Sequence, residues 1–385
     1  MKILLTCHYS FDANAGAAGV TWRLGQEYEK LGHQVYYYSL NNLPNRLHPL
    51  GKFITFPEFV ARKISQLCRQ EGIDIVDAST GDAWVWGILQ QQKKNRPLLV
   101  ARCHGLEHIE HLEYLEEAQR GNLQLSWKYG LYRGGFRLWE SATSMRHSDL
   151  VLLLNSCDAK YVIENLGVES ERVRVVPNAI ADQFLNLPFE PLPEENGVIR
   201  IAQIGTYIPR KGIHYSVPAL NNILARYPQV EVTFLGTQCY ECQDPLKVYE
   251  DFDRAVRDRV KVVPYYTNEN LPKLLKGHQI KLFPTISEGF GIALIEAMAC
   301  GLAPVTTATP GPLEIVRDGL DAIVIPSRNS HAIEQALEKL ICDRAYLEQL
   351  RRNAYATAQL YSWERIAREN LRFYEQAFQQ RKCAS

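Results

Sequence analysis

Residues 280–299 read Ile-Lys-Leu-Phe-Pro-Thr-Ile-Ser-Glu-Gly-Phe-Gly-Ile-Ala-Leu-Ile-Glu-Ala-Met-Ala: a strand-like run, a loop with two glycines, and a strongly apolar run. The first run, 280–283, has the length of a strand buried in a parallel sheet. The apolar run, 292–299, is apolar on every side apart from one glutamate and predicts a buried helix. Strand, tight turn and helix in this order form the unit of a doubly wound α/β fold.

Strand-like runs of the same kind recur along the whole chain, with helical stretches between them. In the first half they are 3–6, 35–39, 73–78, 98–103, 150–154 and 173–176, and in the second half 199–204, 231–235, 260–263, 280–283, 303–306 and 322–325. Short apolar strands that alternate with helices form parallel sheets covered on both faces. The pattern predicts two Rossmann-like, doubly wound units of similar plan.

The length of the chain also predicts two domains. At 385 residues it exceeds the roughly 250–300 beyond which a single core tends to split. Residues 184–198 contain prolines and acidic residues that propagate neither helix nor sheet, so we expect a linker there. The linker separates a first domain at 1–183 from a second at 199–361. The amphipathic stretch 362–385 is expected to form a helix that packs back on the first domain.

Composition excludes several classes of protein. Forty-three basic and forty-three acidic residues leave no net charge, which is not the footprint of a general nucleic-acid binder. No apolar run approaches the roughly eighteen residues of a spanning helix, and the start of the chain lacks a secretory core. Nine scattered cysteines favour reduced thiols over a disulfide framework. We therefore expect a cytoplasmic protein with no nucleic-acid partner.

The loop and helix at 288–296 have the parts of a site for a polyol and a phosphate. Glu296 is the only charge in an apolar helix, and a buried carboxylate needs hydrogen-bond donors. Gly289 and Gly291 let the backbone approach a ligand, and a helix N-terminus offers unpaired amides to negative charge. The alternative is a glycine turn into a core helix whose glutamate pairs with a neighbouring Arg or Lys.

Other loops point to the same kind of site. Gly205 follows the strand 199–204, and Arg210 and Lys211 follow it before the next helix, an arrangement suited to a diphosphate. In the first half, Asn14, Gly16 and Gly19 follow strand one, and His104 follows strand four. Ligands of open α/β sheets bind outside the carboxyl ends of the strands. We expect these loops to converge on one cleft, although a solvated basic pair and a packed loop histidine are the simpler readings.

The residues resemble the retaining GT-B glycosyltransferases of family 4, also called glycosyl transferases group 1, over nearly the whole chain. Glu288 and Glu296 match the motif EGFGxxxxE fully. Residues 301–305 continue this motif. Weaker matches in the first domain are Gly16 and Gly19 together with 31–35, which resemble GG…L…GHxV, and 176–179, which resemble VPNG. Weaker matches in the second domain are 204–205 together with 211–212, which resemble VGR…KG, and 309–316, which resemble GGxPEiV. The resemblance implies a GT-B fold, in which two Rossmann-like domains face each other across a cleft.

The resemblance also implies roles for residues of the second domain. Glu296 would bind the ribose hydroxyls of a nucleotide, and Glu288, Gly289, Phe290 and Gly291 would contact the donor sugar. Lys211, Arg210 and Gly205 would hold the diphosphate. Thr206 stands where the family has arginine, and Arg210 is the candidate to replace it. Val263 marks the expected position of the base.

In the first domain, His104 would contact the donor sugar near its reacting end, and Gly16 would let the backbone approach the diphosphate and acceptor. The catalytic residues predicted are Glu288, His104 and Lys211. The implied reaction moves a sugar from a nucleoside diphosphate sugar to an acceptor hydroxyl of a glycan, a lipid-linked molecule or a small molecule, with retention. The leaving diphosphate would take the acceptor proton, so neither a metal nor another cofactor is expected.

Several alternatives remain open from the sequence. The same fold hosts nucleotide-sugar epimerases and sugar phosphorylases, and a non-catalytic sugar-nucleotide sensor would bind the donor without turnover. His104, His108 and His111 have the spacing of one helical face and suggest a metal centre. Asp251-Phe252-Asp253 offers a DxD metal motif, and Cys239 and Cys242 form the one CxxC; we interpret both as structural.

The stretch 126–140 interleaves basic and aromatic residues, which can rest on an anionic membrane surface. The glycines at 130, 134 and 135 weaken a continuous helix there. A segment that only packs beside the acceptor is the alternative. The membrane reading would place the protein at the inner face of the membrane, as a peripheral protein.

Overall fold

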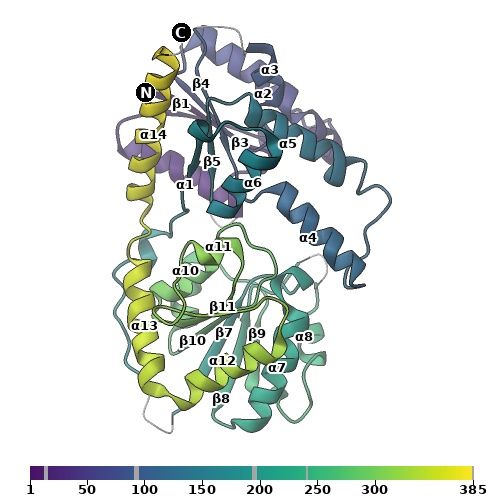
Figure 1. Cartoon of the computed structure of the whole chain (residues 1–385), viewed down its shortest axis with the longest axis vertical. Coiled ribbons are helices and arrows are strands. Elements are labelled where there is room, and N and C mark those ends of the chain that lie inside the picture. Colours follow the sequence, from purple (N-terminus) through teal and green to yellow (C-terminus); the bar gives the residue numbers. More distant parts are fainter. Residues whose placement is uncertain (13–15, 91–94, 193–196, 240–241, 384–385) are drawn as a thin grey trace. The chain divides into compact units, whose positions relative to one another are not determined.

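The computed structural model describes residues 1–12, 16–90, 95–192, 197–239 and 242–383, and Asn14 lies outside them. The chain forms two compact units (Figure 1). Unit 1 is Met1–Ala179 together with Trp363–Ser385, and unit 2 is Ile180–Ser362. None of the helices described is long and apolar enough to cross a membrane.

Unit 1 is a six-stranded parallel sheet in the order β2-β1-β3-β4-β5-β6, with helices on both faces. Its strands are β1 (Lys2–Cys7), β2 (Gln34–Ser39), β3 (Ile75–Ser79), β4 (Leu98–Arg102), β5 (Leu150–Leu153) and β6 (Val173–Val175). Its helices are α1 (Gly16–Lys30), α2 (Pro49–Gln70), α3 (Trp84–Gln90), α4 (Glu107–Gln119), α5 (Arg137–Arg146), α6 (Ser156–Leu166) and α14 (Trp363–Cys383).

Unit 2 is a second six-stranded parallel sheet, in the order β12-β11-β10-β7-β8-β9. Its strands are β7 (Ile199–Ile204), β8 (Val230–Leu235), β9 (Val260–Val263), β10 (Ile280–Phe283), β11 (Ala303–Thr307) and β12 (Ile323–Ile325). Its helices are α7 (Ile213–Arg226), α8 (Leu246–Glu250), α9 (Leu271–Leu275), α10 (Ile292–Ala299), α11 (Pro310–Leu313), α12 (Ser330–Cys342) and α13 (Arg344–Ala358). The predicted α/β fold and all twelve predicted strands are confirmed, with each end within two residues of its prediction.

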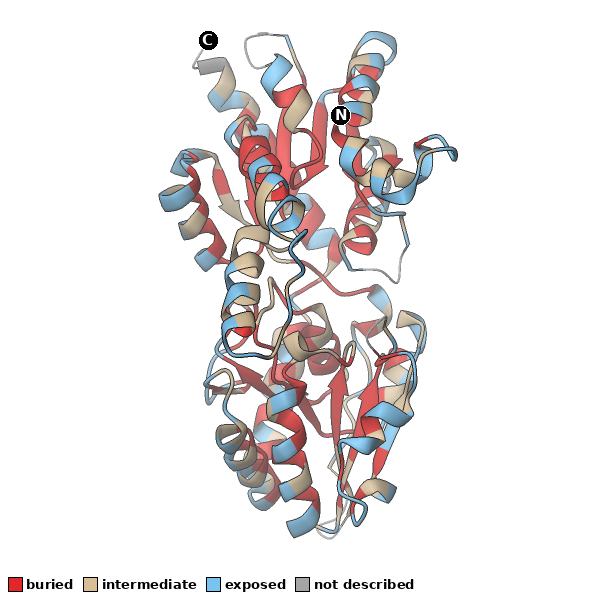
Figure 2. Cartoon of the chain, turned by 90° about the vertical axis from the view of Figure 1, so that its right-hand side faces the viewer, coloured by how far each residue is buried: buried red, intermediate tan, exposed pale blue. Residues whose placement is uncertain are grey.

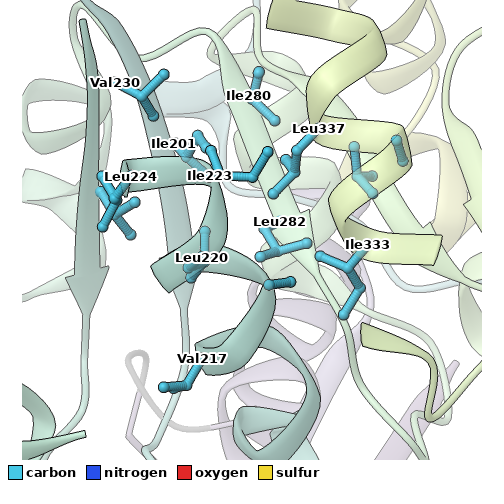
Figure 3. Close-up of a cluster of buried hydrophobic side chains, with 14 of the residues drawn as sticks. Ile201, Val217, Leu220, Ile223, Leu224, Val230, Ile280, Leu282, Ile333 and Leu337 are labelled. Carbon is cyan, nitrogen blue, oxygen red and sulfur yellow. The ribbon is translucent and has the colours of Figure 1, made fainter. Parts of the chain in front are cut away.

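The central strands of both sheets are buried on both faces, as their composition predicts, and the edge strands are partly exposed (Figure 2). In unit 2, Leu220 and Ile223 of α7 and Leu337 of α12 point onto the sheet, where they meet Ile201 and Leu282 (Figure 3). All five side chains are fully buried. Burying a Leu or Ile side chain contributes about 1.5–3 kcal/mol, so this layer stabilises the packing of α7 and α12 on the sheet.

Each sheet has one place where the direction of strand order reverses. In unit 1 the chain moves from β1 to β2 on one side, and then crosses to β3 on the other side of β1. In unit 2 it moves from β7 through β8 to β9, and then crosses to β10 on the other side of β7. Loops that leave neighbouring strands in opposite directions open a crevice at their carboxyl ends, which is the usual ligand site of such sheets.

Helix α14 is fixed to unit 1 by a buried polar network. The Tyr374 hydroxyl donates to Asp77, which also forms an ion pair with Arg102 at 2.6 Å. The hydroxyls of Tyr28 and Tyr374 are 3.0 Å apart, which ties α14 to α1. The end of the chain is therefore part of the first sheet's packing, although it is remote in sequence.

The structure divides the chain a few residues earlier than the predicted linker at 184–198. The part of this stretch that is described lies in unit 2: Phe184 is fully buried, and the ring of Phe189 lies 5.6 Å from that of Tyr355. The guanidinium of Arg351 donates to the carbonyl of Glu190 at 2.8 Å. The ring of Phe189 thus finds its partner on α13, which proline content alone does not reveal.

Candidate functional site

The site in unit 2 is built from the two loops that leave β7 and β10. The β7 loop contains a 3₁₀ turn, Pro209–Lys211, and ends at Gly212. Gly212 has φ of +75°, and a Cβ there would lie 1.9 Å from the carbonyl oxygen of Pro284 in the other loop. The carbonyl of Arg210 accepts hydrogen bonds from Thr285 Oγ1 at 3.2 Å and Ile286 N at 3.0 Å. Only glycine allows this close approach, which locks the two loops together.

The locked loops bring Lys211 and Glu288 into contact. Lys211 Nζ lies 2.6 Å from Glu288 Oε2, and both side chains are less than one fifth exposed. Burial opposes the charge of Glu288, but the cations Lys211 and Arg210 outweigh it and lower the pKa of the carboxyl. The two residues, 77 apart in sequence, therefore form a charged pair at neutral pH.

The loop from Glu288 to Gly291 leads directly into α10. Gly291 has φ of +107° at the start of the helix, and Phe290 is buried. Gly311 packs on this loop: its amide donates to the carbonyl of Glu288 at 3.0 Å, and a Cβ would lie 2.5 Å from Phe290 N. The amide of Leu294 donates to the carbonyl of Gly291 at 2.9 Å, which leaves the amides of Ile292 and Ala293 at the start of α10 without a backbone acceptor in the described chain and available to an anion.

Glu296 is buried in α10, as its apolar surroundings predict, but its partner was not foreseen. The amide of Asn268 donates to Glu296 Oε1 at 2.7 Å. The phenol of Tyr266 lies close by, and its pKa is raised by burial and by the charge of Glu296. The loop after β9 therefore reaches across to α10, a contact that no motif in the sequence marks.

Val263 ends β9 at the same edge of the sheet. Its carbonyl accepts from Gly236 N at 2.8 Å and is engaged in the backbone of the sheet. Beside it is a cavity of about 970 Å³ whose lining includes Tyr265, Tyr266 and Asn270. The lining also includes Arg200 and Glu231, so the cavity extends from the amino ends of β7 and β8 to Val263. Because β9 lies two strands from β7, Val263 is roughly 10 Å to one side of the β7 loop.

Lys281 is a charged residue of this region that the sequence reasoning missed. It lies in the middle of β10, is fully buried, and its Nζ has no hydrogen-bond partner in the part of the chain that is described. The Nζ lies 5.2 Å from the ring centre of Phe283, and Lys211 Nζ lies 5.8 Å from the same ring. Burial and the charge of Lys211 lower the pKa of Lys281 well below its usual value, while Glu296 and Glu288 oppose the shift. A lysine inside an otherwise apolar strand was the available signal.

The two predicted residues of the first domain lie in unit 1. Gly16 is the exposed first residue of α1, and no atom lies within 4 Å of the place of a Cβ. His104 is in the loop between β4 and α4, where its Nε2 lies 3.3 Å from Thr21 Oγ1. Burial lowers the pKa of His104 to about 3, helped by Arg102 and His8, so the imidazole is neutral. The other predicted residues, from Gly205 to Glu296, lie in unit 2.

The three histidines considered as a metal centre do not share a helical face. His104 precedes α4, which begins at Glu107, and His111 Nδ1 lies 3.0 Å from the hydroxyl of Tyr129. Over the described ranges, no group of three His, Cys, Asp or Glu residues could hold a metal ion. Asp251 of the DxD sequence accepts from the hydroxyl of Tyr207 at 2.6 Å.

The CxxC also forms a local structure. Cys239 and Cys242 exchange two backbone hydrogen bonds, at 3.0 and 3.2 Å, and neither is part of a disulfide. The two residues therefore close a turn, which agrees with the interpretation of the CxxC as a structural feature.

Comparison with known families matches both halves of the chain. The family model described as Glycosyltransferase Family 4 matches residues 15–184, and the one described as Glycosyl transferases group 1 matches residues 188–357. One curated relative is an uncharacterised glycosyltransferase, MJ1607, of Methanocaldococcus jannaschii. It is 27% identical over 179 residues, which are 46% of this chain and 44% of that protein. The chain thus aligns with less than half of this relative.

Solved structures resemble the whole chain. Sucrose-phosphate synthase from Thermosynechococcus elongatus has a TM-score of 0.77 at 19% identity, over 98% of this chain and 99% of that one. Anabaena HepE, in complex with UDP-glucose, has a TM-score of 0.69 at 19% identity, over 96% of this chain and 99% of that one. These likenesses confirm the GT-B fold.

Proposed function

We propose, on the premise that this chain belongs to the glycosyltransferases of group 1 and family 4, that it transfers a hexose from a nucleoside diphosphate sugar to an acceptor hydroxyl. The observation that carries the proposal is the cationic crevice at the β7–β10 crossover, where Lys211 meets Glu288 at 2.6 Å beside the start of α10. Cations and free amides together suit a diphosphate. A solved structure of the same fold, HepE, contains UDP-glucose, which supports a nucleotide sugar as the donor.

The proposed donor lies along the edge of the unit 2 sheet. Its diphosphate is neutralised by Lys211, with Arg210 in place of the arginine absent at Thr206. In the described part of the chain Arg210 makes no ion pair, so its charge is available. Gly205 lets the phosphate approach the β7 loop, where the nearest atoms to a Cβ belong to Lys211 itself. The leaving group is stabilised where its negative charge develops.

The ribose and base of the donor are assigned to the neighbouring loops. Glu296 accepts from the ribose hydroxyls, with Asn268 holding its other side at 2.7 Å. The base lies beside Val263, in the cavity lined by Tyr265 and Tyr266. This arrangement fits the roughly 10 Å between the β7 loop and the end of β9.

The sugar is assigned to Glu288 and to the backbone of Gly289, Phe290 and Gly291. His104 lies in unit 1 and is neutral at physiological pH, and its role at the reacting end of the donor sugar stays a prediction. We propose retention of the anomeric configuration: the leaving diphosphate takes the acceptor proton on the face from which it departs. This reaction needs no base behind the sugar and no metal ion.

The test has two stages. A thermal-shift screen of nucleoside diphosphates identifies the base, and the matching nucleotide sugars are then incubated with acceptors in the presence of a chelator. We expect transfer with EDTA present, and NMR of the product should show the anomeric configuration of the donor. An α donor that gives a β product contradicts retention, and conversion of the donor without an acceptor favours an epimerase.

We further propose that the segment 126–140 makes a peripheral contact with an anionic membrane. Trp127 and Leu131 are 77% and 66% exposed, and the exposed Lys128 and Arg133 lie in the same segment. Trp139, in contrast, packs on Trp84 with ring centres 4.9 Å apart. In vesicle flotation, the variants Trp127→Ser and Leu131→Ser should therefore no longer bind anionic vesicles. The control variant Leu313→Ser replaces an exposed side chain of unit 2 and should bind as the wild type does. Equal flotation of all variants contradicts the contact.

A further inference from the structure

Lys281 is a buried amine in the middle of the unit 2 sheet. In the register of the sheet it lies between Ala202 of β7 and Pro304 of β11, whose side chains have no polar atom. The Lys281 side chain is fully buried, and across the described residues its Nζ has no hydrogen-bond partner. A charge is unfavourable in such a place, and a buried lysine commonly gives up its proton instead.

The side chain of Lys281 points away from the apolar layer under α7 and α12. Its neighbours Ile280 and Leu282 belong to that layer (Figure 3). Side chains alternate between the two faces of a strand, so Lys281 and Phe283 share the opposite face. Lys281 is therefore set apart from the largest apolar cluster of the unit.

The amine of Lys281 lies close to the proposed diphosphate site. Its Nζ is 5.2 Å from the ring centre of Phe283, and the Nζ of Lys211 is 5.8 Å from the same centre. The two amines are therefore no farther apart than the sum of these distances. Charges interact appreciably over about 10 Å inside a protein, so a change of charge at Lys211 acts on Lys281.

Neighbouring charges act on Lys281 in opposite ways. Burial and the charge of Lys211 lower the pKa of Lys281, whereas the carboxylates of Glu296 and Glu288 oppose the shift. An anion beside Lys211 changes this balance, because it cancels the repulsion by Lys211 and itself attracts a cation.

The other elements packed against β10 add few titratable groups. Strand β7 contributes Arg200, which lies 2.8 Å from Glu231, and β11, with the sequence Ala-Pro-Val-Thr-Thr, contributes none. Helix α10 contributes Glu296 and, at its end, Cys300, whose pKa burial raises to about 12. A proton that is taken up near pH 8, and is no longer taken up when Lys281 is replaced, is therefore assigned to this amine.

We propose that Lys281 is a neutral amine in the free protein and takes up one proton from the solvent when a diphosphate binds beside Lys211. The inference rests on the proposed donor site and adds a proton to its binding step. The new ammonium compensates negative charge of the diphosphate from inside the sheet. No covalent bond to the ligand forms, so Lys281 is a positioning and charge-balancing residue.

Proton uptake makes the affinity for a diphosphate depend on pH. The ammonium form of Lys281 favours the ligand, and this form becomes rarer as the pH rises. The affinity should therefore fall with rising pH, by at most about tenfold per pH unit for one proton. A lysine that only fills space, with the same charge before and after binding, gives no such slope.

Calorimetry of the whole chain measures the proton directly. The nucleoside diphosphate from the thermal-shift screen is titrated at pH 7, 8 and 9, each in buffers that differ in their enthalpy of ionisation. The dependence of the observed enthalpy on that of the buffer gives the number of protons taken up. The secondary pKa of a phosphate is about 6, so the ligand itself takes up no proton at pH 8.

In the wild-type protein we expect uptake of about half a proton or more at one of these pH values. Lys281→Met should abolish the uptake and lower the affinity about tenfold at pH 7, with a smaller loss at pH 9. The matched control is Lys339→Met. Lys339 of α12 also lies on an aromatic ring, with its Nζ 4.3 Å from the ring centre of Tyr346, but it is exposed. This variant should take up the same number of protons as the wild type.

Binding by the wild type without proton uptake at any of the three pH values overturns the inference, and this result does not depend on how any variant folds. Equal uptake in the wild type and Lys281→Met also overturns it, because the proton then belongs to another group. In both outcomes the nucleotide still binds, so the donor site stands. If the wild-type protein binds no nucleoside diphosphate, the proposed function itself fails.

Discussion

The crossover in unit 2 and the crossover in unit 1 are the same feature of sheet topology with different chemistry. At β7 and β10, Lys211 and Glu288 form an ion pair, with Arg210 and the buried Lys281 close by. At β1 and β3, His8 and Asp82 form a hydrogen-bonded pair, and a cavity beside them of about 450 Å³ is lined with tyrosines. The first crevice carries an excess of cations, and the second combines aromatic rings with charges of both signs.

The difference shows how one fold rule gives two crevices of different chemistry. The crossover of strand order fixes where a crevice opens, because the loops of neighbouring strands turn away from each other there. The side chains on those loops then decide what fits. A cationic crevice suits a diphosphate, whereas aromatic rings offer a ligand flat apolar faces.

The largest effect is expected from Lys211→Ala. It leaves the mostly buried Glu288 without its partner, which typically costs about 3–5 kcal/mol when a buried pair is broken. That cost should appear as a lower melting temperature. Nucleoside diphosphate affinity, measured by calorimetry, should fall by several-fold to about a hundredfold, because the variant loses about 1–3 kcal/mol of charge-assisted hydrogen bonding to the diphosphate. An unchanged affinity would remove Lys211 from the diphosphate site.

A matched control for this variant is Arg226→Ala. Arg226 also lies 2.6 Å from a glutamate, Glu334, but its side chain is 42% exposed. An exposed pair contributes about 0–1 kcal/mol, so nucleotide affinity should be unaffected.

Lys281→Met should stabilise the protein. Methionine fills similar space without a buried charge, and replacements of this kind gain about 1–4 kcal/mol. Because the pKa of Lys281 is lowered in the fold, the wild-type protein gains stability as the pH rises from that pKa toward the ordinary value of 10.5. The advantage of Lys281→Met in thermal melting should thus be greatest at neutral pH and shrink toward pH 10. A melting temperature that is lower than that of the wild type at pH 7 would show that the ammonium has a partner that stabilises it.

Asn268→Ala should have a smaller effect, confined to the nucleoside part of the donor. It removes a hydrogen bond to the Glu296 carboxylate. Such a bond to a charged group contributes about 1.5–3 kcal/mol, and here it holds the Glu296 side chain in one orientation. We expect the affinity for the nucleoside diphosphate to fall by about tenfold, while the affinity for inorganic diphosphate stays the same. Equal losses for both ligands would place Glu296 at the phosphates instead of the ribose.

The smallest effect is a pH dependence of stability from Glu288. Its pKa lies below the ordinary 4.5, so the stabilisation by Lys211 is complete above pH 4.5 and is lost as the pH falls through the lowered pKa. The difference in melting temperature between wild type and Glu288→Gln should be constant from pH 7 to 5 and should shrink at lower pH. A difference that already changes between pH 7 and 6 contradicts a lowered pKa.

Sequence patterns predicted most of the fold because strand and helix formation depend on local features. Runs such as 199–204 and 260–263 are apolar, short and bounded by turn residues, and their ends agree with β7 and β9. The position of the domain boundary was harder to predict, since Phe189 finds its partner Tyr355 on α13, far along the chain. Spacing alone placed His104 on a helix with His108 and His111, whereas the chain between β4 and α4 is a loop.

The sequence by itself determined the strand–loop–helix at 280–299, the two glycines that open its helix, and the burial of Glu296, because all three follow from the order of neighbouring residues. Tertiary structure alone decided which groups meet: Asn268 with Glu296, Lys211 with Glu288, and His8 with Asp82. These contacts join residues that are 28 to 77 positions apart in the sequence. Strand order in the sheet brings such loops together, and strand order is set by packing of the whole sheet against its helices, which no local stretch of sequence records.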